Sequence, residues 1–335
     1  MKPKPFAALV AVTALALLFA IVSYASNNRW APTRISGTAL LPGLAAQADR
    51  IAKIELSQGG KTLALTREKE NWALADRGQY PAKSESVRAL IVKLAQAETI
   101  EPKTQSKDRL ALLELEDPGA KDAKSRLVRL LDDKGAVVGE AIVGKKRFDA
   151  FGASKSGTYM RRPGEAQAWL TGADVDVGLG VRDWVRPQVF DLAAAKIAGV
   201  SIEIPGEEPL KIAREGDKHA LSALPKDQKL KEGANIDAIV RAVGSIDLED
   251  VRKPDGSSGG EAGVAKIEGD GGLGVTLKLR KQGEEYWLAL AATGEGDSKA
   301  TAEEITRRTQ GWEFKIPASK AEAILKRRAD LTESS

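Results

Sequence analysis

The sequence predicts an α+β fold: an N-terminal transmembrane helix followed by two homologous, mainly antiparallel sheet-plus-helix units. Three observations predict it. An uncharged apolar run occupies residues 6–24, alternating apolar and polar residues indicate strands with one buried face, and one stretch occurs twice. The first copy runs from Ile51 to Leu94 and the second from Ile197 to Val243. In both copies strands precede a helical pattern, so the chain is predicted to contain an internal duplication.

The charge composition does not have the electrostatic footprint of a nucleic-acid binder. The 335 residues include 51 Lys and Arg and 47 Asp and Glu, which gives a net charge of +4. The two signs are interleaved along the chain, whereas nucleic-acid binders cluster basic residues on one face. No nucleic-acid partner is therefore expected. The chain has no cysteine, which excludes disulfides, thiolate metal sites and a cysteine nucleophile.

Residues 1–26 are predicted to form a signal anchor. Lys2 and Lys4 precede the apolar run from Phe6 to Tyr24, and about 20 apolar helical residues are enough to cross a bilayer core. Lysines before the run keep the N-terminus cytoplasmic. We therefore expect a single-pass protein of the bacterial inner membrane whose C-terminal region is periplasmic. A signal peptide cleaved after Ser23-Tyr24-Ala25 is the alternative. Residues 27–50 are expected to form a polar connector.

The first unit is predicted to span residues 51–195 and to begin with three strands. Residues 51–56 and 61–68 alternate in polarity, with a turn at Gly59-Gly60 between them, and residues 71–75 form the third strand. Ser84 is the expected N-cap of the helix that follows. This helix presents one apolar stripe to the sheet, formed by Val87, Leu90, Ile91 and Leu94.

The rest of the first unit is predicted to add a short helix, three strands and a second short helix. The first short helix ends at Pro118-Gly119. Two strands flank the turn Asp133-Lys134-Gly135, and residues 157–162 form the third. The segment after Pro163 is predicted to be helical, and the unit closes with residues 181–192.

The second unit is predicted to span residues 196–335 and to repeat this order. Ile197 aligns with Ile51, and Asn235 is the expected cap of the covering helix. Residues 253–274 are rich in Gly and Ser, which predicts a mobile surface loop. Residues 275–294 are predicted to match the hairpin at 127–144, with Gly283 in the place of Gly135. Pro317 then stands opposite Pro163.

No catalytic, cofactor-binding or metal site is predicted. His219 is the only histidine and stands where the first copy has Trp72, so a structural role is favoured over catalysis or metal binding. Residues 269–274 satisfy G-x-G-x-x-G, but a strand pattern follows where the dinucleotide motif needs a helix. No nucleotide is therefore expected to bind. The acidic clusters are interpreted as solvated loop charges: Glu114, Glu116 and Asp117, and Asp247, Glu249 and Asp250.

Tyr80, Pro81 and Trp184 are the predicted contacts with a partner, because all three are expected in exposed loops. The pairs Arg67-Glu68 and Arg214-Glu215 recur at the same place in both copies. Salt bridging at a strand edge explains a duplicated pair better than catalysis does, because one enzyme rarely needs two copies of a site.

The residues from Trp72 to Glu101, WALADRGQYPAKSESVRALIVKLAQAETIE, resemble the signature of a bacterial family known as domain of unknown function 4340. Further similarity covers residues 113–118, 157–170 and 182–192. The resemblance is good over residues 38–195 and weaker beyond, where His219 replaces Trp72 and the Tyr-Pro-Ala turn is missing. It implies a membrane-anchored exported protein, associated with ABC-type transport systems related to gliding-motility auxiliary components. It carries over no catalytic residue.

Three functions are compatible with the sequence. The first is a non-enzymatic periplasmic accessory subunit of an ABC-type envelope transport complex, which acts by protein–protein contact with a permease or another envelope protein. The second is a periplasmic binding module for cell-wall glycan or another envelope component, which would need exposed aromatic residues in a groove. The third is a carboxylate-based envelope hydrolase, which would need two close acidic residues in one deep pocket.

Overall fold

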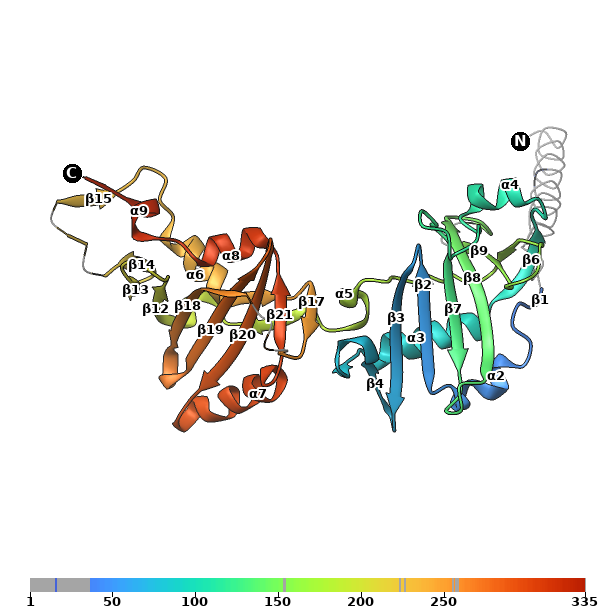
Figure 1. Cartoon of the computed structure of the whole chain (residues 1–335), viewed down its shortest axis with the longest axis horizontal. Coiled ribbons are helices and arrows are strands. Elements are labelled where there is room, and N and C mark those ends of the chain that lie inside the picture. The colour runs from blue at the N-terminus through green and yellow to red at the C-terminus, as the bar shows by residue number, and fades with distance from the viewer. Residues whose placement is uncertain are drawn as a thin grey trace, which may run out of the picture.

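The computed structural model describes residue 16 and residues 37–152, 155–222, 224–225, 227–254, 256 and 259–334. These residues form two lobes that lie side by side, as Figure 1 shows, and the predicted α+β class with mainly antiparallel sheets is confirmed. The predicted signal anchor, with its apolar run at residues 6–24, lies outside the described residues apart from residue 16, as do residues 27–36 of the connector. None of the helices that are described combines the length and the apolar character that a membrane crossing requires.

The first lobe is built on a ten-stranded sheet with the order β1-β6-β10-β9-β8-β7-β2-β3-β4-β5. Helix α3 crosses one face of this sheet (Figure 1). The elements of the lobe are β1 (Thr38–Ala39), α2 (Leu44–Gln47), β2 (Lys53–Gln58), β3 (Lys61–Glu68), β4 (Asn71–Leu74), β5 (Tyr80–Pro81), α3 (Ser84–Ala95), β6 (Glu98–Pro102), α4 (Lys107–Leu110), β7 (Arg126–Leu131), β8 (Val137–Arg147), β9 (Gly157–Arg161) and β10 (Trp169–Thr171).

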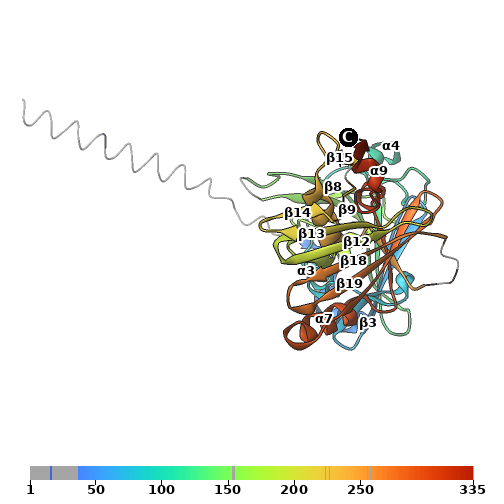
Figure 2. The ribbon, with the colours of Figure 1, turned by 90° about the vertical axis from the view of Figure 1, so that its left-hand side faces the viewer.

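The second lobe is built on an eight-stranded sheet with the order β14-β13-β12-β18-β19-β20-β21-β17. Helices α7 and α9 lie at opposite ends of this lobe (Figure 1, Figure 2). Its elements are β12 (Ile197–Glu203), β13 (Leu210–Glu215), β14 (Lys218–Leu221), β15 (Gln228–Leu230), α6 (Ile236–Gly244), β16 (Ser245–Asp247), β17 (Asp250–Arg252), β18 (Gly260–Gly269), β19 (Gly274–Gln282), β20 (Glu285–Thr293), α7 (Lys299–Thr309), β21 (Glu313–Ile316), α8 (Ala318–Ile324), α9 (Arg328–Leu331) and β22 (Thr332–Ser334).

The eight strands of the second sheet follow the same order as eight strands of the first. Strands β4-β3-β2-β7-β8-β9-β10-β6 correspond in turn to β14-β13-β12-β18-β19-β20-β21-β17. The predicted match of residues 275–294 with the hairpin at 127–144 is therefore wrong by one strand: β18 and β19, not β19 and β20, correspond to β7 and β8. Gly135, in the β7–β8 turn, corresponds to the turn between β18 and β19, whereas Gly283 lies in the β19–β20 turn. Pro317 follows β21, and Pro163 follows β9 rather than β10, so these two prolines are not equivalent.

The second hairpin of each lobe, β3–β4 in the first lobe and β13–β14 in the second, has the same register. Trp72 lies opposite Arg67 in one lobe, and His219 lies opposite Arg214 in the other. Each arginine donates a hydrogen bond to the carbonyl of a residue just before the first strand, Asp49 for Arg67 and Ala195 for Arg214. The predicted salt bridging is confirmed in part: Arg214 pairs with Asp270 at 2.6 Å, while both guanidinium groups also turn toward the chain that enters the sheet.

The predicted helices of the two copies are present, and one of the two predicted caps is confirmed. All four stripe residues of α3 are buried, because they face the sheet. The side chain of Asn235 accepts from the Ala238 amide at 2.9 Å, as a capping residue does. Ser84 is not a cap: its hydroxyl accepts from the amide of Trp72 at 3.2 Å and so joins α3 to β4.

Two predicted segments have a different structure. The predicted helix after Pro163 is wrong, because residues 169–171 form strand β10, which pairs with both β9 and β6. Tertiary pairing there outweighs a weak helical pattern. The predicted surface loop at 253–274 contains the long strand β18, which pairs with β12 and β19. Its inward face consists of the small or apolar residues Gly263, Ala265 and Ile267, which are buried.

Buried side chains of both lobes belong to one hydrophobic cluster. It extends from Leu40 and Ile51 in the first lobe, through Val181 and Trp184 of the connection, to Phe314 and Ile324 in the second. The connection between the lobes consists of α5 (Val181–Trp184) and β11 (Gln188–Asp191), and β11 pairs with β16 of the second lobe. The junction of the lobes is therefore packed rather than a free linker.

Candidate functional site

The candidate site is the junction between the lobes, which we define as β5, the start of α3, the connection around α5, and the ends of β17, α7 and β21. The chain is held there by backbone contacts. The Lys83 amide donates to the Trp184 carbonyl at 2.6 Å, and the Arg308 guanidinium donates to the Gln188 carbonyl at 2.7 Å. Segments that are far apart in the sequence thus meet around α5.

A two-point ion pair crosses the junction. Arg77, just before β5, donates from Nε to Asp250 Oδ1 at 2.6 Å and from a terminal nitrogen to Oδ2 at 3.1 Å. The hydrogen bond to Asp250 raises the pKa of Arg77, and burial opposes that shift. Bidentate contacts of this kind fix the relative orientation of the two groups as well as their separation. The pair therefore ties the edge strand of the first lobe to β17 of the second.

An aromatic contact crosses the junction beside the ion pair. The ring of Tyr80 meets the rings of Trp312 and Phe314 edge-on, at centroid distances of 5.0 and 6.1 Å. Lys253 lies against Gly78, and its Nζ is 5.5 Å from the centre of the Trp312 ring. Burial raises the pKa of the Tyr80 phenol, and the nearby charge of Arg308 partly offsets this. Edge-to-face aromatic pairs stabilise a contact beyond the area that they bury.

The three predicted contact residues lie at this junction, but they are not equally exposed. Pro81 is exposed, and Tyr80 is partly buried against the second lobe. The expected exposure of Trp184 is wrong: only 4% of this residue is exposed, and its indole nitrogen donates to the Gly178 carbonyl at 3.0 Å. Trp184 thus packs the connection into the core and has no surface to offer a partner.

Three neighbouring hollows open on the junction, with volumes of about 480, 580 and 470 Å³. The first and third share Arg182, and the second and third share Lys83, so the three hollows are neighbours. Basic side chains outnumber acidic ones along their walls. The basic residues are Lys83, Lys93, Arg182, Arg186, Arg241, Arg307, Arg308 and Lys320, and the acidic residues are Glu85, Asp176, Asp183 and Asp247. We call the three hollows together the basic groove.

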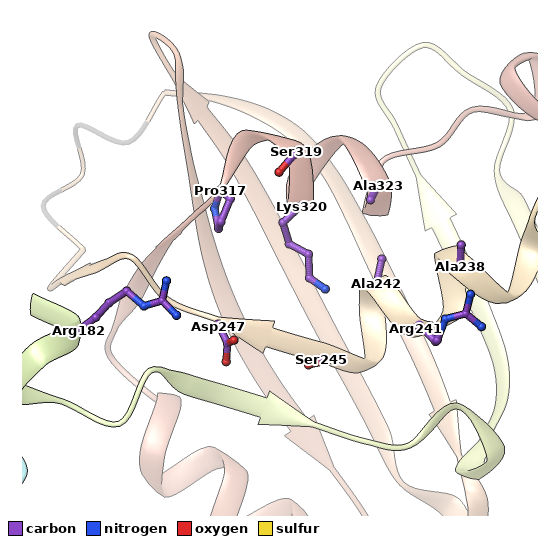
Figure 3. A pocket seen from close by; sticks show the side chains of 10 residues that line it. All are labelled: Arg182, Ala238, Arg241, Ala242, Ser245, Asp247, Pro317, Ser319, Lys320 and Ala323. Carbon is purple, nitrogen blue, oxygen red and sulfur yellow. The ribbon is translucent and has the colours of Figure 1, made fainter.

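The first hollow lies between α6, α8 and the end of β16, and Figure 3 shows its lining. Lys320 extends from α8 into the space above Ser245 and Asp247, and Arg182 reaches toward it from α5. Burial lowers the pKa of Lys320, while the charge of Asp247 opposes this shift. Lys320 is thus a partly desolvated ammonium group that faces an open space.

His219 has a structural role in this lobe. It is 8% exposed, its Nδ1 lies 2.9 Å from Asp237 Oδ1, and its Nε2 lies 3.0 Å from the Ile197 carbonyl. Both ring nitrogens are therefore engaged in joining β14 to α6 and β12. The hydrogen bond from His219 lowers the pKa of Asp237.

The other motifs noted in the sequence also have structural roles. Residues 269–274 form the β18–β19 turn, with the short 3-10 helix η5 (Asp270–Gly272), and β19 follows directly. Glu116 accepts from the backbone of Lys124 and Ser125, and Asp117 accepts from Gly119. Within the described ranges, no group of three or more His, Asp or Glu residues is arranged to hold a metal ion.

Sequence reasoning located β5 and α5 at the site but missed the basic groove. Arg182, Arg241 and Lys320 are separated by scores of residues and stand in segments where acidic residues are interleaved. No linear spacing brings them together; only the return of α8 over α6 does so. The sequence signal for the groove was the pair Arg182 and Arg186 on either side of Trp184. The buried Trp184 side chain holds this segment at the junction.

The comparisons with known proteins gave one match. The model of the family described as Domain of unknown function (DUF4340) matches residues 72–266, which is more than half of the chain. The match begins at Trp72 in β4, spans the connection around α5 and ends within β18. No curated protein and no solved structure matched the chain.

Proposed function

Because the chain belongs to the family of Domain of unknown function (DUF4340), we propose that it is a non-enzymatic periplasmic accessory subunit of an ABC-type envelope transport complex. It acts by protein–protein contact, and the contact surface is the lobe junction. The permease of such a complex is the partner. The apolar run at residues 6–24 holds the chain to the inner membrane as a signal anchor.

One observation carries this proposal: the second hollow of the basic groove is lined by Tyr80 and Trp312, the two rings of the aromatic contact that crosses the junction. Lys83 and Arg186 line the groove beside Tyr80, whose ring bridges to the second lobe. Arginine and tyrosine are enriched where proteins bind one another, while an acid–base reaction would need close carboxylates in a pocket. Along the groove cations predominate, so it is suited to hold a partner rather than to transfer protons.

The two lobes are further proposed to derive from one duplicated unit. The shared strand order and the shared register at Trp72 and His219 support this. The lobes have since diverged at the junction, since the first supplies an edge strand and the second supplies the aromatic residues that receive it. A duplicated scaffold in which each half contributes a different surface suits a protein that connects components of a complex.

The proposal is tested by purifying the tagged full-length chain from its native envelope in mild detergent and identifying what accompanies it. We expect a permease together with its ATPase subunit. A variant with Lys83→Glu and Arg186→Glu should lose them, because it reverses charge in the groove. Lys278→Glu with Lys299→Glu is the matched control, since both lysines are exposed and lie outside the groove. Recovery of the chain alone, with transport intact in a deletion strain, overturns the proposal.

A further inference from the structure

The first hollow of the basic groove has the chemistry of an anion site. Arg182, Arg241 and Lys320 line it from three different elements, and Asp247 is its single acidic residue. Among the residues that the structure describes, none of these three basic side chains forms an ion pair. Arg77, by contrast, is paired with the carboxylate of Asp250 at the junction.

We propose that this hollow binds carboxylate groups from an acidic segment of a partner protein, with Lys320 as the central contact. This inference rests on the proposed function and names the chemistry of the partner. Lys320 contributes most because a charge that has already lost part of its water interacts more strongly with an incoming carboxylate. Arg182 and Arg241 are exposed at the rim and add attraction at longer range.

The walls and extent of the hollow favour a peptide over a free oxyanion. Ala238, Ala242, Ala323 and Pro317 form apolar walls, against which the methylene groups of an acidic side chain can pack. The volume of about 480 Å³ exceeds what a single phosphate or sulfate would fill. Arg182 also lines the third hollow, and Lys83 lines the third and the second, so an extended segment that leaves the first hollow meets further cations in the neighbouring ones.

The test uses the full-length chain in a non-ionic detergent and a fluorescein-labelled hexaglutamate peptide as probe, with binding followed by fluorescence anisotropy. Lys320→Gln should weaken binding at least about fivefold, and Arg182→Gln and Arg241→Gln by smaller factors. Lys320→Arg keeps the charge and should restore most of the affinity. Lys278→Gln, on the exposed side of β19, removes the same charge outside the groove and should leave binding within about twofold.

Other outcomes would overturn the site, the proposed function or both. Equal effects of Lys320→Gln and Lys278→Gln would mean that the peptide senses only net charge. Displacement of the peptide by inorganic phosphate at equal concentration would assign the hollow to a free oxyanion, and binding of hexalysine would contradict charge recognition. Peptide binding without recovery of a permease would overturn the proposed function and leave this site standing; the reverse result would overturn the site alone.

Discussion

Arg77 and Asp250 form a bidentate ion pair between the two lobes, with nitrogen–oxygen distances of 2.6 and 3.1 Å. The partners are 173 residues apart in the chain: Arg77 ends the 3-10 helix η2 (Ala75–Arg77) just before the edge strand β5, and Asp250 begins β17, the edge strand of the second sheet. Beside them, Tyr80 meets Trp312. The relative position of the lobes therefore depends on a charged contact and an aromatic contact that act side by side.

Replacing Arg77 by Gln should loosen the junction without unfolding either lobe. The two side chains are about one-third exposed, so we expect a cost of only about 1 kcal/mol in the free energy that holds the lobes together. The chain has no cysteine, so spin labels at Glu70→Cys and Glu284→Cys, both highly exposed, report the distance between lobes. The distance distribution should broaden. Arg214→Gln, which breaks a pair with Asp270 inside the second lobe, should leave it unchanged.

The aromatic contact should respond to the loss of the ring and not of the hydroxyl. Tyr80→Ala removes a partly buried ring that meets Trp312 and Phe314, which should cost about 2–4 kcal/mol of junction free energy and broaden the same distance distribution further. Tyr80→Phe keeps the ring and should behave as the natural chain does. A Tyr80→Phe variant as loose as Tyr80→Ala would show that the hydroxyl holds the junction, contrary to this expectation.

Tyr80 should ionise at a higher pH than an ordinary tyrosine, whose pKa is about 10. Burial favours its neutral form in the folded protein and so raises its pKa. The contribution of this group to stability is present below about pH 10 and is lost as the pH rises through the folded pKa. The difference in phenolate absorbance between the natural chain and Tyr80→Phe during an alkaline titration isolates the group. A midpoint at or below the ordinary value would contradict the burial described here.

The contact between His219 and Asp237 should stabilise the second lobe above the ordinary pKa of aspartate, about 3.9. The hydrogen bond from His219 lowers the folded pKa of Asp237, so this stability is lost as the pH falls through that lowered value. Asp237→Asn should therefore flatten the acid side of the stability profile, measured as urea midpoints between about pH 6 and about pH 3. Asp217→Asn, an exposed aspartate of the neighbouring turn, is the control and should leave the profile unchanged.

The elements that the sequence predicted correctly are those whose local pattern and tertiary role agree. The stripe of α3 and the cap of α6 are examples, because periodicity and side-chain chemistry both favour a helix there. Strand β18 was missed because its buried face includes Gly263 and Ala265, which give no hydrophobic alternation. Strand β10 was missed because its extended form depends on pairing with β6, more than 60 residues earlier.

The candidate site was predictable only in part, for a related reason. Aromatic residues make up only 5% of the chain, so Tyr80 and Trp184 could be predicted as contact residues from the sequence. Whether each one faces water or the core depends on the opposite lobe, and the sequence of one segment does not contain that information. The same holds for Lys320, whose surroundings come from α5, α6 and β16.

The two edge strands of the ten-stranded sheet lie in different surroundings. Strand β1, with which the continuously described chain begins, forms one edge, and β5, which carries Tyr80, forms the other. Adjacent strands are about 4.8 Å apart, so the nine intervals between these edges measure about 40 Å along the sheet. The width of the first sheet therefore separates β1 from the aromatic contact at Tyr80, and a change in this separation would require whole strands to be added or deleted.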